Sequence, residues 1–465
     1  MIAAICALLS ALAFYFSIGL GEQWALAWVA PIPVLWLAFG EAPLWRAFAM
    51  AFVAYAIGGA NYFTAYLGVM PPLVLALLVG APALLFGVAV GAAGLIRKRL
   101  GWVAGIMAFA ALWAAFDFLS AFNRAGGSAT TPAAAEVDAP MLVQVAAFAG
   151  FVGVTFLIGA VSAALAAALR TRTSLFAIAA IGIFALNATF GAWRMSAHPT
   201  GAMRVMLIAS NDAVGNVSRD DEDVALQTID AYAAEIDRLR SAQPDLVLLP
   251  ENIARLAPEW REAAQAPLAT AARQAHATLV AGFNTRVDGA QRNVAWAFAP
   301  NASTVTYEKR RLVLGLETRA YKPGASAQVL DSGVGLEICK DMDFHSMIRA
   351  DIASAHPTLL AVPAWDFGAD GWAHARIALL RSVENGVPMA RAARNGWLTV
   401  NDRYGRIIAR TRVTSGFATL VSDVPLSGLG GATIYSRIGD VFGWTCVTLA
   451  TILLFAALAK GRRQQ

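Results

Sequence analysis

The chain has 465 residues, of which 58% are hydrophobic and only 14% are charged, a composition too apolar for a soluble protein of this size. Its formal net charge is a modest +5, carried largely by arginines that flank apolar segments, and nothing in it suggests nucleic-acid binding. The apolar residues are concentrated before Ala192 and after Gly439, and the segment between them has an ordinary soluble composition. The composition therefore predicts a multi-span membrane protein with one large soluble domain.

Eight apolar segments approach the length of about 20 residues that a helix needs to cross a bilayer. They are residues 2–20, 24–39, 47–67, 73–96, 102–119, 142–169, 175–193 and 441–459. The first lacks the basic start and the small-residue cleavage site of a secretory signal, so we expect it to be retained. Pro31 and Pro33 are expected to break or kink the second. Residues 1–195 thus form a predicted membrane domain of seven helices, and residues 438–465 supply the eighth helix and a short cytoplasmic tail.

Basic residues in the short loops predict the orientation, because cytoplasmic loops are enriched in lysine and arginine. With both termini in the cytoplasm, four basic sites become cytoplasmic: Arg46; Arg97, Lys98 and Arg99; Arg170 and Arg172; and Lys460, Arg462 and Arg463. Arg124 is the one short-loop exception, within a polar loop of small residues that extends to about residue 139. This orientation places the soluble domain, residues 201–437, on the outer side of the membrane.

The soluble domain alternates strand patterns with helix patterns along the chain. The predicted strands are residues 205–209, 246–249, 278–283, 293–299, 327–330, 358–362, 389–392 and 397–401, and one more that ends at Cys339. The predicted helices are residues 220–240, 261–276 and 372–385, and one that begins near residue 347. Alternation of this kind predicts an α/β layered sandwich.

Three polar residues stand at the ends of apolar segments of this domain, in the order Glu251, Lys309 and Cys339. A thiolate can attack an acyl carbon, a carboxylate can carry its proton, and an ammonium can stabilise the thiolate and the developing oxyanion. The residue types and their order therefore predict nucleophilic catalysis at a thiol. Cys6 and Cys446 lie inside apolar segments, so Cys339 is the only thiol of the soluble domain and no disulfide can form within it.

Each of these residues, taken alone, also has an ordinary structural interpretation. A single cysteine in an apolar segment is usually buried and inert, and Glu251 after a proline is typical of a helix cap. Lys309 could belong to a solvated basic face with Arg310 and Arg311, and Asp341 could begin a helix. The combination of these residues, in order and in context, is what favours catalysis. The histidines of the domain lack metal-ligand spacing, so we expect no metal and no cofactor.

Longer stretches of the chain resemble a known family. The soluble domain is similar to the carbon–nitrogen hydrolase (nitrilase) superfamily, whose members use glutamate, lysine and cysteine in this order. The whole chain resembles the membrane-embedded branch of that superfamily, the apolipoprotein N-acyltransferase family. The likeness is carried by residues 24–36, by Gln144 with Gly150, Gly153 and Phe156, by the Tyr-x-Lys-x-x-Leu-Val motif at 307–313, by residues 376–405, and by Pro425, Gly428, Tyr435, Arg437, Gly439 and Asp440.

The resemblance implies a multi-span α-helical membrane domain plus a nitrilase-like α-β-β-α sandwich. Carried over residue by residue, it makes Cys339 the nucleophile, Glu251 the general base and Lys309 the group that stabilises the thiolate and the oxyanion. Glu317 falls where the family has its second active-site glutamate. Asp341 occupies the acidic position two residues after the nucleophile. Both are implied supporting carboxylates.

The family transfers a fatty acyl chain from a membrane phospholipid to the α-amino group of a lipoprotein's lipidated N-terminal cysteine, by a ping-pong reaction through a thioester. The resemblance therefore implies a thioester at Cys339, a phospholipid donor and a lipoprotein acceptor. It also implies the bacterial inner membrane as the location, with the soluble domain facing the periplasm. We expect a monomer that binds no nucleic acid.

The loops around Asn252, Gly315, Lys340 and Trp365 depart from the usual motifs of the family, so two further activities stay open at this point. One is a membrane-anchored amidase or nitrilase that hydrolyses a C–N bond of a small substrate. The other is an acyltransferase with a different amine acceptor. A scaffold whose catalytic domain has decayed is disfavoured by the intact Glu, Lys and Cys set. A long acyl chain bound to Cys339 would distinguish an acyltransferase from an amidase.

The distribution of basic residues makes the topology testable. A reporter fused after Arg463 should behave as cytoplasmic, and the same reporter inserted near Gly289 should behave as exported, because the short basic loops are retained on the cytoplasmic side. Alkaline phosphatase activity and green fluorescence report the two locations. The reverse pattern would contradict both the orientation and the family resemblance.

Overall fold

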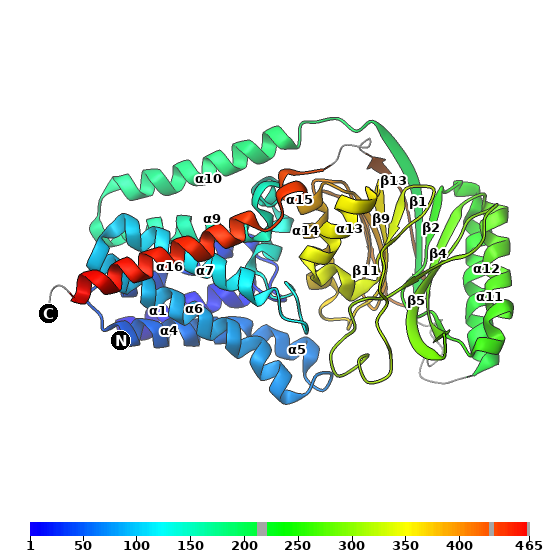
Figure 1. Ribbon diagram of the computed structural model, residues 1–465, viewed down its shortest axis with the longest axis horizontal. Coiled ribbons are helices and arrows are strands. Elements are labelled where there is room, and N and C mark those ends of the chain that lie inside the picture. Colours follow the sequence, from blue (N-terminus) through cyan, green and yellow to red (C-terminus); the bar gives the residue numbers. More distant parts are fainter. Residues whose placement is uncertain (212–220, 427–431, 463–465) are drawn as a thin grey trace. The chain divides into compact units, whose positions relative to one another are not determined.

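The apolar segments from the two ends of the chain fold together, and the segment between them folds separately (Figure 1). The structure is a computed structural model that describes residues 1–211, 221–426 and 432–462. One unit combines Met1–Ala197 with Thr433–Gln465, and the other is His198–Ala432. The expected helix start at Asp220, the family-like Gly428 and the basic Arg463 lie outside the described residues.

Six helices in the described part of the membrane unit are long and apolar enough to cross a membrane. They are α4 (Leu44–Gly58) continued by α5 (Tyr62–Tyr66), α6 (Pro72–Leu100), α7 (Trp102–Ser120), α9 (Ala146–Thr171), α10 (Ser174–Arg194) and α16 (Val441–Arg462). The first two predicted spans are shorter helices. The first is α1 (Ile2–Ser17), and the second is divided into α2 (Trp24–Ala27) and α3 (Ile32–Ala38). The break follows from Pro31 and Pro33, which cannot continue the backbone hydrogen bonds of a helix.

The segment between α7 and α9, predicted to be a polar loop of small residues, is largely buried in the membrane unit. Its second half forms the 3-10 helix η2 (Pro132–Asp138), which precedes the short helix α8 (Pro140–Val143) and contacts α2, α8 and α9. Glu136 is fully buried there, and one of its oxygens accepts a hydrogen bond from Trp28 Nε1 at 2.8 Å. The alanines of this segment pack closely against the helices, which its small-residue composition allows but does not by itself predict.

The soluble unit is a four-layer α-β-β-α sandwich, which confirms the predicted fold class (Figure 1). One sheet has the strand order β13-β1-β2-β4-β5-β6 with β3 beside β4, and the other has the order β12-β11-β10-β9-β8-β7. The strands of the first sheet are β1 (Gly201–Ser210), β2 (Leu246–Leu248), β3 (Ala254–Arg255), β4 (Thr278–Val287), β5 (Ala290–Phe298), β6 (Val305–Glu308) and β13 (Phe417–Leu426). Those of the second are β7 (Gln328–Val329), β8 (Val334–Leu336), β9 (Leu359–Trp365), β10 (Met389–Arg394), β11 (Trp397–Asn401) and β12 (Ile407–Arg412).

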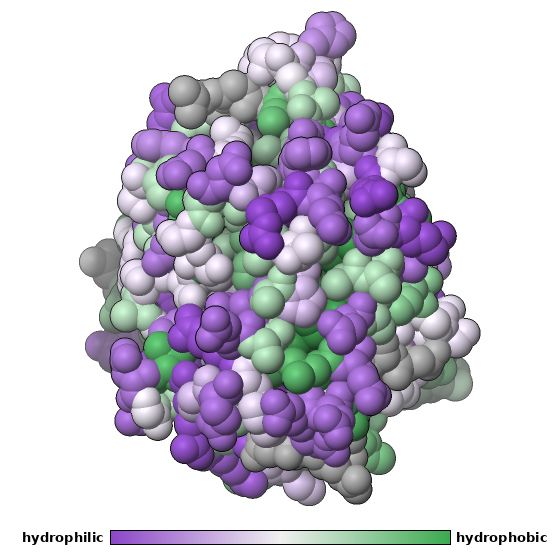
Figure 2. All heavy atoms as spheres, turned by 90° about the vertical axis from the view of Figure 1, so that its right-hand side faces the viewer, coloured by the Kyte–Doolittle hydropathy of each residue, from purple (hydrophilic) through white to green (hydrophobic). Residues whose placement is uncertain are grey.

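Helices cover the outer faces of both sheets. The first sheet packs against α11 (Glu222–Leu239) and α12 (Arg261–Ala275). The second lies beside α13 (His345–Ala355) and α14 (Gly371–Asn385). Figure 2 shows the side on which α11 and α12 lie, where hydrophilic side chains dominate and hydrophobic ones form small patches. This surface is typical of a domain that contacts water.

Two hydrophobic cores hold the sandwich together, and β1 contributes to both of them. Val205 and Leu207 lie in the core between the two sheets, whereas Met206 and Ile208 lie in the core beneath α11 and α12. A strand that is buried on both faces has a continuous apolar sequence instead of an alternating one, as Val205 to Ala209 shows. Continuous apolar sequence therefore predicted the central strands well.

Four strands were not predicted from the sequence: β3, β6, β12 and β13. The last two contain Arg, Thr, Ser and Asp residues at the sheet margins, so their patterns do not stand out from those of surface loops. β13 pairs antiparallel with β1 along its full length, from Gly201 opposite Leu426 to Ser210 opposite Phe417. The strand that was predicted to end at Cys339 ends at Leu336 instead, and Cys339 begins the 3-10 helix η5 (Cys339–Asp343).

Candidate active site

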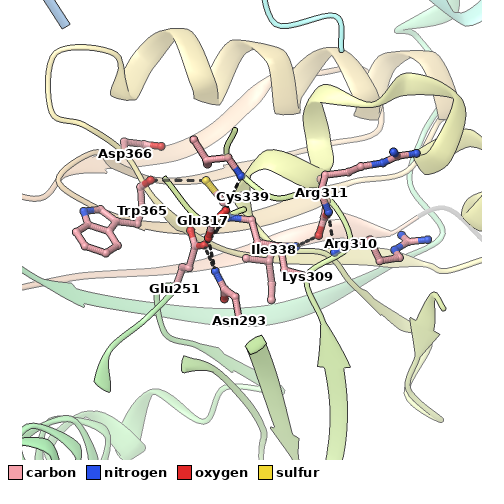
Figure 3. A network of polar contacts seen from close by, with 12 residues as sticks. Glu251, Asn293, Lys309, Arg310, Arg311, Glu317, Ile338, Cys339, Trp365 and Asp366 are labelled. Atoms are coloured by element: carbon pink, nitrogen blue, oxygen red, sulfur yellow. Dashed lines mark hydrogen bonds and ion pairs between the residues drawn. The ribbon is translucent and has the colours of Figure 1, made fainter. Parts of the chain in front are cut away.

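The three predicted catalytic residues belong to segments that directly follow strands of the two facing sheets (Figure 3). Glu251 follows β2, Lys309 follows β6 of the same sheet, and Cys339 follows β8 of the other. The two sheets are joined next to Glu251, whose backbone N–H donates to the carbonyl of Ala364 in β9 at 3.3 Å. The sandwich therefore brings together residues that are far apart in the sequence.

The Lys309 ammonium is the centre of the site. Its Nζ lies 2.8 Å from Glu251 Oε1 and 2.9 Å from the Glu317 carboxylate, and its side chain is only 1% exposed (Figure 3). Burial would lower the pKa of Lys309, but Glu251 and Glu317 outweigh burial and raise it well above its usual value. The Lys309 ammonium in turn overcomes burial and lowers the pKa of Glu317. The Lys309 ammonium and the Glu317 carboxylate thus stabilise each other's charge inside the protein.

Asn293 completes this cluster, although no sequence motif had identified it as a site residue. It lies on β5 directly opposite Lys309, whose backbone N–H donates to the Asn293 carbonyl at 2.8 Å. The Asn293 side-chain amide donates to Glu251 at 2.6 Å and to Glu317 at 2.8 Å. A polar residue at the start of a predicted strand, 293–299, was the available signal. Only the pairing of β5 with β6 shows that its side chain meets the two carboxylates.

Cys339 lies beside this cluster with a strained backbone. Its φ of 44° is in the left-handed region, which costs about 1–3 kcal/mol for a residue with a side chain and is common at active sites. Its thiol donates to the carbonyl of Trp365 over 3.6 Å (Figure 3). Burial and the Glu251 carboxylate raise the pKa of Cys339 well above its usual value, although Lys309 acts in the opposite direction. The resting thiol is therefore protonated and needs a base before it can attack.

Asp341 links the lysine segment to the cysteine segment. One of its oxygens accepts the backbone N–H groups of Arg310 at 3.2 Å and Arg311 at 2.8 Å. The other accepts the Ile338 N–H at 3.1 Å and the Tyr307 hydroxyl at 2.7 Å. These four bonds tie the backbone after Lys309 and the Tyr307 side chain to the residue before Cys339. Asp341 does lie within a 3-10 helix, but its side chain bonds to the lysine segment as well as to its own turn.

A second charged group lies behind the Cys339 turn. Arg310 forms ion pairs with Glu337 at 2.9 Å and with Asp351, so it does not belong to a solvated basic face. The Tyr307 hydroxyl lies 2.9 Å from Glu337 in the same group. Tyr307 and Glu337 are buried, Arg310 and Asp351 are partly buried, and the network accounts for Tyr307 and Arg310 of the segment around Lys309.

A third charged group lies on the other side of the thiol. Asp366, which follows Trp365, accepts two bonds from Arg391 at 2.5 and 3.1 Å, and His374 Nδ1 lies 3.3 Å from it. These contacts fix the segment that supplies the carbonyl partner of the thiol. Among the departures from the family, Lys340 pairs with Asp343 at 3.0 Å, so the lysine next to the nucleophile is itself held by a carboxylate. In the described part of the chain, no group of three or more His, Cys, Asp or Glu side chains could hold a metal ion.

Comparison with known proteins follows the division of the chain into two units. The carbon–nitrogen hydrolase family matches residues 213–443, and the apolipoprotein N-acyltransferase N-terminal domain matches residues 7–164. A relative from Geobacter metallireducens, named apolipoprotein N-acyltransferase, is 32% identical over 36% of this chain and 32% of its own length. Relatives of the same name cover more of the chain. The protein from Gloeobacter violaceus is 27% identical over 79% of this chain and 74% of its own length. The protein from Azotobacter vinelandii is 26% identical over 96% of this chain and 92% of its own length.

Gly282 on β4 supports the position of Glu251 and gives a test of the site geometry. A Cβ at Gly282 would lie 2.6 Å from Glu251 Cα and 2.8 Å from the Pro250 carbonyl oxygen, so the backbone at Glu251 would have to move. We expect Gly282→Ala to destabilise the domain by about 1–3 kcal/mol through overpacking. Because Glu251 is displaced, alkylation of Cys339 by iodoacetamide should also slow several-fold. Thermal unfolding and the alkylation rate, measured in a Cys6→Ala/Cys446→Ala background, check both effects.

Gly201→Ala is the matched control, because a Cβ there meets no other atom within 4 Å. It should leave both quantities unchanged. An unaltered unfolding midpoint and alkylation rate in Gly282→Ala would show that the Glu251 backbone does not depend on this close approach.

Proposed function

This chain belongs to the apolipoprotein N-acyltransferase family, and from that premise we propose that it moves a fatty acyl chain from a membrane phospholipid to the α-amino group of a lipoprotein's lipidated N-terminal cysteine. The chain is a multi-span membrane protein and an enzyme of the nitrilase superfamily. The proposed location is the bacterial inner membrane with the soluble domain in the periplasm, an orientation supported by the basic short loops. Residues 1–195 and 438–465 are the proposed membrane part.

One observation carries the proposal of thioester chemistry. The buried Lys309 ammonium is bound by two carboxylates beside the single thiol of the soluble unit. A buried ion pair contributes little to stability compared with apolar residues of similar volume, so its presence next to a strained cysteine favours a catalytic role. The membrane helices of the same chain support a substrate that resides in a lipid bilayer.

The first half-reaction forms the acyl-enzyme. Glu251 takes the proton of the Cys339 thiol, and the thiolate sulfur attacks the carbonyl carbon of a phospholipid ester. The carbonyl oxygen becomes an oxyanion, which the Lys309 ammonium stabilises. The tetrahedral intermediate collapses when the ester C–O bond breaks. The departing lysophospholipid oxygen takes the proton back from Glu251, which leaves a thioester on Cys339 and an ionised carboxylate.

The second half-reaction passes the acyl chain to the amine. Glu251 takes a proton from the incoming ammonium, and the free amine attacks the thioester carbon. Lys309 stabilises the second oxyanion in the same way as the first. When the C–S bond breaks, Cys339 leaves as the thiolate and regains a proton from Glu251. The ionised Glu251 carboxylate then takes the second proton of the attacking nitrogen, which leaves a neutral amide, and passes that proton to water. In this scheme Glu317 fixes the Lys309 ammonium, and Asp341 fixes the backbone that follows Lys309.

The nucleophile can be tested by removing one thiol at a time. Cys339→Ala should abolish turnover and the covalent acyl adduct, whereas Cys6→Ala and Cys446→Ala should leave both nearly intact. Cys339→Ser should also fail, because a hydroxyl is far less ionised than a thiol in the same surroundings. Mass spectrometry of the purified protein after loading with phospholipid detects the adduct.

A long fatty acyl mass on Cys339 that disappears when a lipidated peptide is added would support the proposal. An adduct that is released to water at the same rate without the acceptor would favour the amidase alternative. Loss of the adduct in Cys6→Ala or Cys446→Ala, with Cys339→Ala still acylated, would rule out the assigned nucleophile.

Glu251 and Lys309 can be distinguished by their effects on the two half-reactions. Glu251→Gln should slow both, because the amide cannot accept a proton from the thiol or from the ammonium. Lys309→Met removes the oxyanion donor and the field that favours the thiolate, so acyl-enzyme formation should fall by about 100-fold or more. Single-turnover formation of the acyl-enzyme, followed by addition of a lipidated peptide, measures each step. Wild-type rates of acylation in both variants would show that another group activates Cys339.

A further inference from the structure

Arg394 carries a buried guanidinium to which no described residue is hydrogen-bonded. It is the last residue of β10 and is only 1% exposed. Its Nε, Nη1 and Nη2 atoms are all buried, and none has a hydrogen-bond partner in the described part of the chain. Buried polar atoms in proteins are nearly always hydrogen-bonded, and a buried charge without a partner is far more costly than a buried neutral group. Other interactions must therefore offset the free-energy cost of burying the Arg394 charge.

One compensation is the aromatic ring of Trp365. Arg394 lies directly opposite Trp365 in the parallel pairing of β10 with β9. The central carbon of its guanidinium lies 3.4 Å from the centroid of the Trp365 ring. The face of an aromatic ring carries partial negative charge, so this stacking favours the charged form of the arginine. It does not satisfy the N–H groups, which lie in the plane of the guanidinium.

The other compensation is the carboxylate of Glu251. The Glu251 backbone is bonded to Ala364, the neighbour of Trp365, which brings Glu251 to the end of the strand that pairs with Arg394. Burial lowers the pKa of Arg394 to about 10, and the strongest opposing influence is Glu251, followed by Tyr232. Arg394 is therefore charged at neutral pH, and its main electrostatic partner is the proposed general base.

The site has a net negative charge that an additional cation would neutralise. Glu251, Glu317 and Lys309 contribute two carboxylates and one ammonium, which leaves one net negative charge in a buried position. Asp366 does not alter this sum, because Arg391 forms a bidentate ion pair with it. A net negative charge next to Cys339 disfavours formation of a thiolate. The charge of Arg394 returns the sum to zero.

We propose that Arg394, stacked on Trp365, is the counter-cation of the Glu251–Lys309–Glu317 cluster and a positioning residue for Cys339 catalysis. The assignment rests on the proposed function, in which Cys339 must become a thiolate during the reaction. Arg394 contacts neither substrate nor the thiol in this scheme. Its positive charge stabilises the negatively charged forms of Glu251 and Cys339, the carboxylate and the thiolate, by electrostatic attraction.

Several charged groups face the thiol and the Glu251 carboxylate, and the test has to separate Arg394 from them. By segment they are Glu251 after β2, Lys309 after β6, Glu317 and Tyr321 in the next loop, Asp366 after β9, and Arg391 and Arg394 on β10. Only substitutions that change the net charge of this set should shift the ionisation of Cys339. A substitution that merely loosens the packing should not shift it in a predictable direction.

The experiment measures the rate of Cys339 alkylation by iodoacetamide as a function of pH, in the full-length Cys6→Ala/Cys446→Ala protein. Removal of a positive charge raises the pKa of the thiol, so Arg394→Gln should move the alkylation profile to higher pH by about one unit, which slows alkylation about tenfold on the rising limb. Glu317→Gln removes a negative charge and should move the profile to lower pH. In the double variant the two shifts should largely cancel.

Arg410→Gln is the matched control, because Arg410 also stacks on a tryptophan, with its guanidinium carbon 4.4 Å from the Trp372 centroid, but lies on β12 away from the cluster. Its profile should coincide with that of the parent protein. An unshifted profile in Arg394→Gln would overturn the proposal, and so would shifts of the same sign in Arg394→Gln and Glu317→Gln. If Arg394→Gln does not fold, the double variant is compared with Glu317→Gln alone, and identical profiles overturn the proposal.

The readout is independent of acyl transfer. Failure to form an acyl-enzyme would contradict the proposed function, but the alkylation profile would still report whether Arg394 controls the Cys339 thiol. A shifted profile together with normal acylation of the parent protein supports both.

Discussion

The site depends on one buried ammonium held between two carboxylates. A lysine that is 1% exposed stays charged because Glu251 and Glu317 lie within 2.9 Å of it, and the lysine in turn lowers the pKa of Glu317. Removal of any member leaves an uncompensated charge inside the protein. The mutual dependence explains why further groups, the Asn293 amide and the Asp341 carboxylate, are used to hold this geometry.

The sandwich is arranged so that this ion cluster meets the thiol. Glu251 and Lys309 come from one sheet and Cys339 from the other, so the two sheets must be in register at this end. The bonds from Glu251 to Ala364 and from Asp341 to the lysine segment supply that register. Hydrophobic packing between the sheets is non-directional and could not by itself place two atoms within hydrogen-bonding distance. The apolar core therefore holds the two sheets together, and the directional hydrogen bonds fix their register at the site.

The charged groups around Cys339 support different segments of the site. The network of Tyr307, Arg310 and Glu337 supports the lysine segment from behind, and the pair of Asp366 and Arg391 fixes the segment that contacts the thiol. Each of these sets contains cations and anions in contact. Arg394 differs because its guanidinium stacks on an aromatic ring and has no hydrogen-bond partner among the described residues. Its positive charge is therefore not used up in an ion pair and can act on Glu251 and Cys339.

The sequence by itself determined the apolar helices of the membrane unit, the central strands of the sandwich, and the order of Glu251, Lys309 and Cys339. These features follow from composition, from continuous apolar stretches and from the residue types at strand ends, which can all be recognised within short segments of the sequence. The family resemblance added Glu317 and Asp341. The local pattern did not predict β12 and β13, because Arg, Thr, Ser and Asp residues are mixed with their apolar residues, as in surface loops.

Only the tertiary structure decided which distant residues meet. The position of Asn293 opposite Lys309 depends on the register of β5 with β6, and that of Arg394 on Trp365 depends on the pairing of β10 with β9. The burial of Glu136 depends on how η2 packs against α2 and α9. Each of these is a contact between segments that are not adjacent in the chain, set by strand register and helix packing, which no local pattern of residues contains.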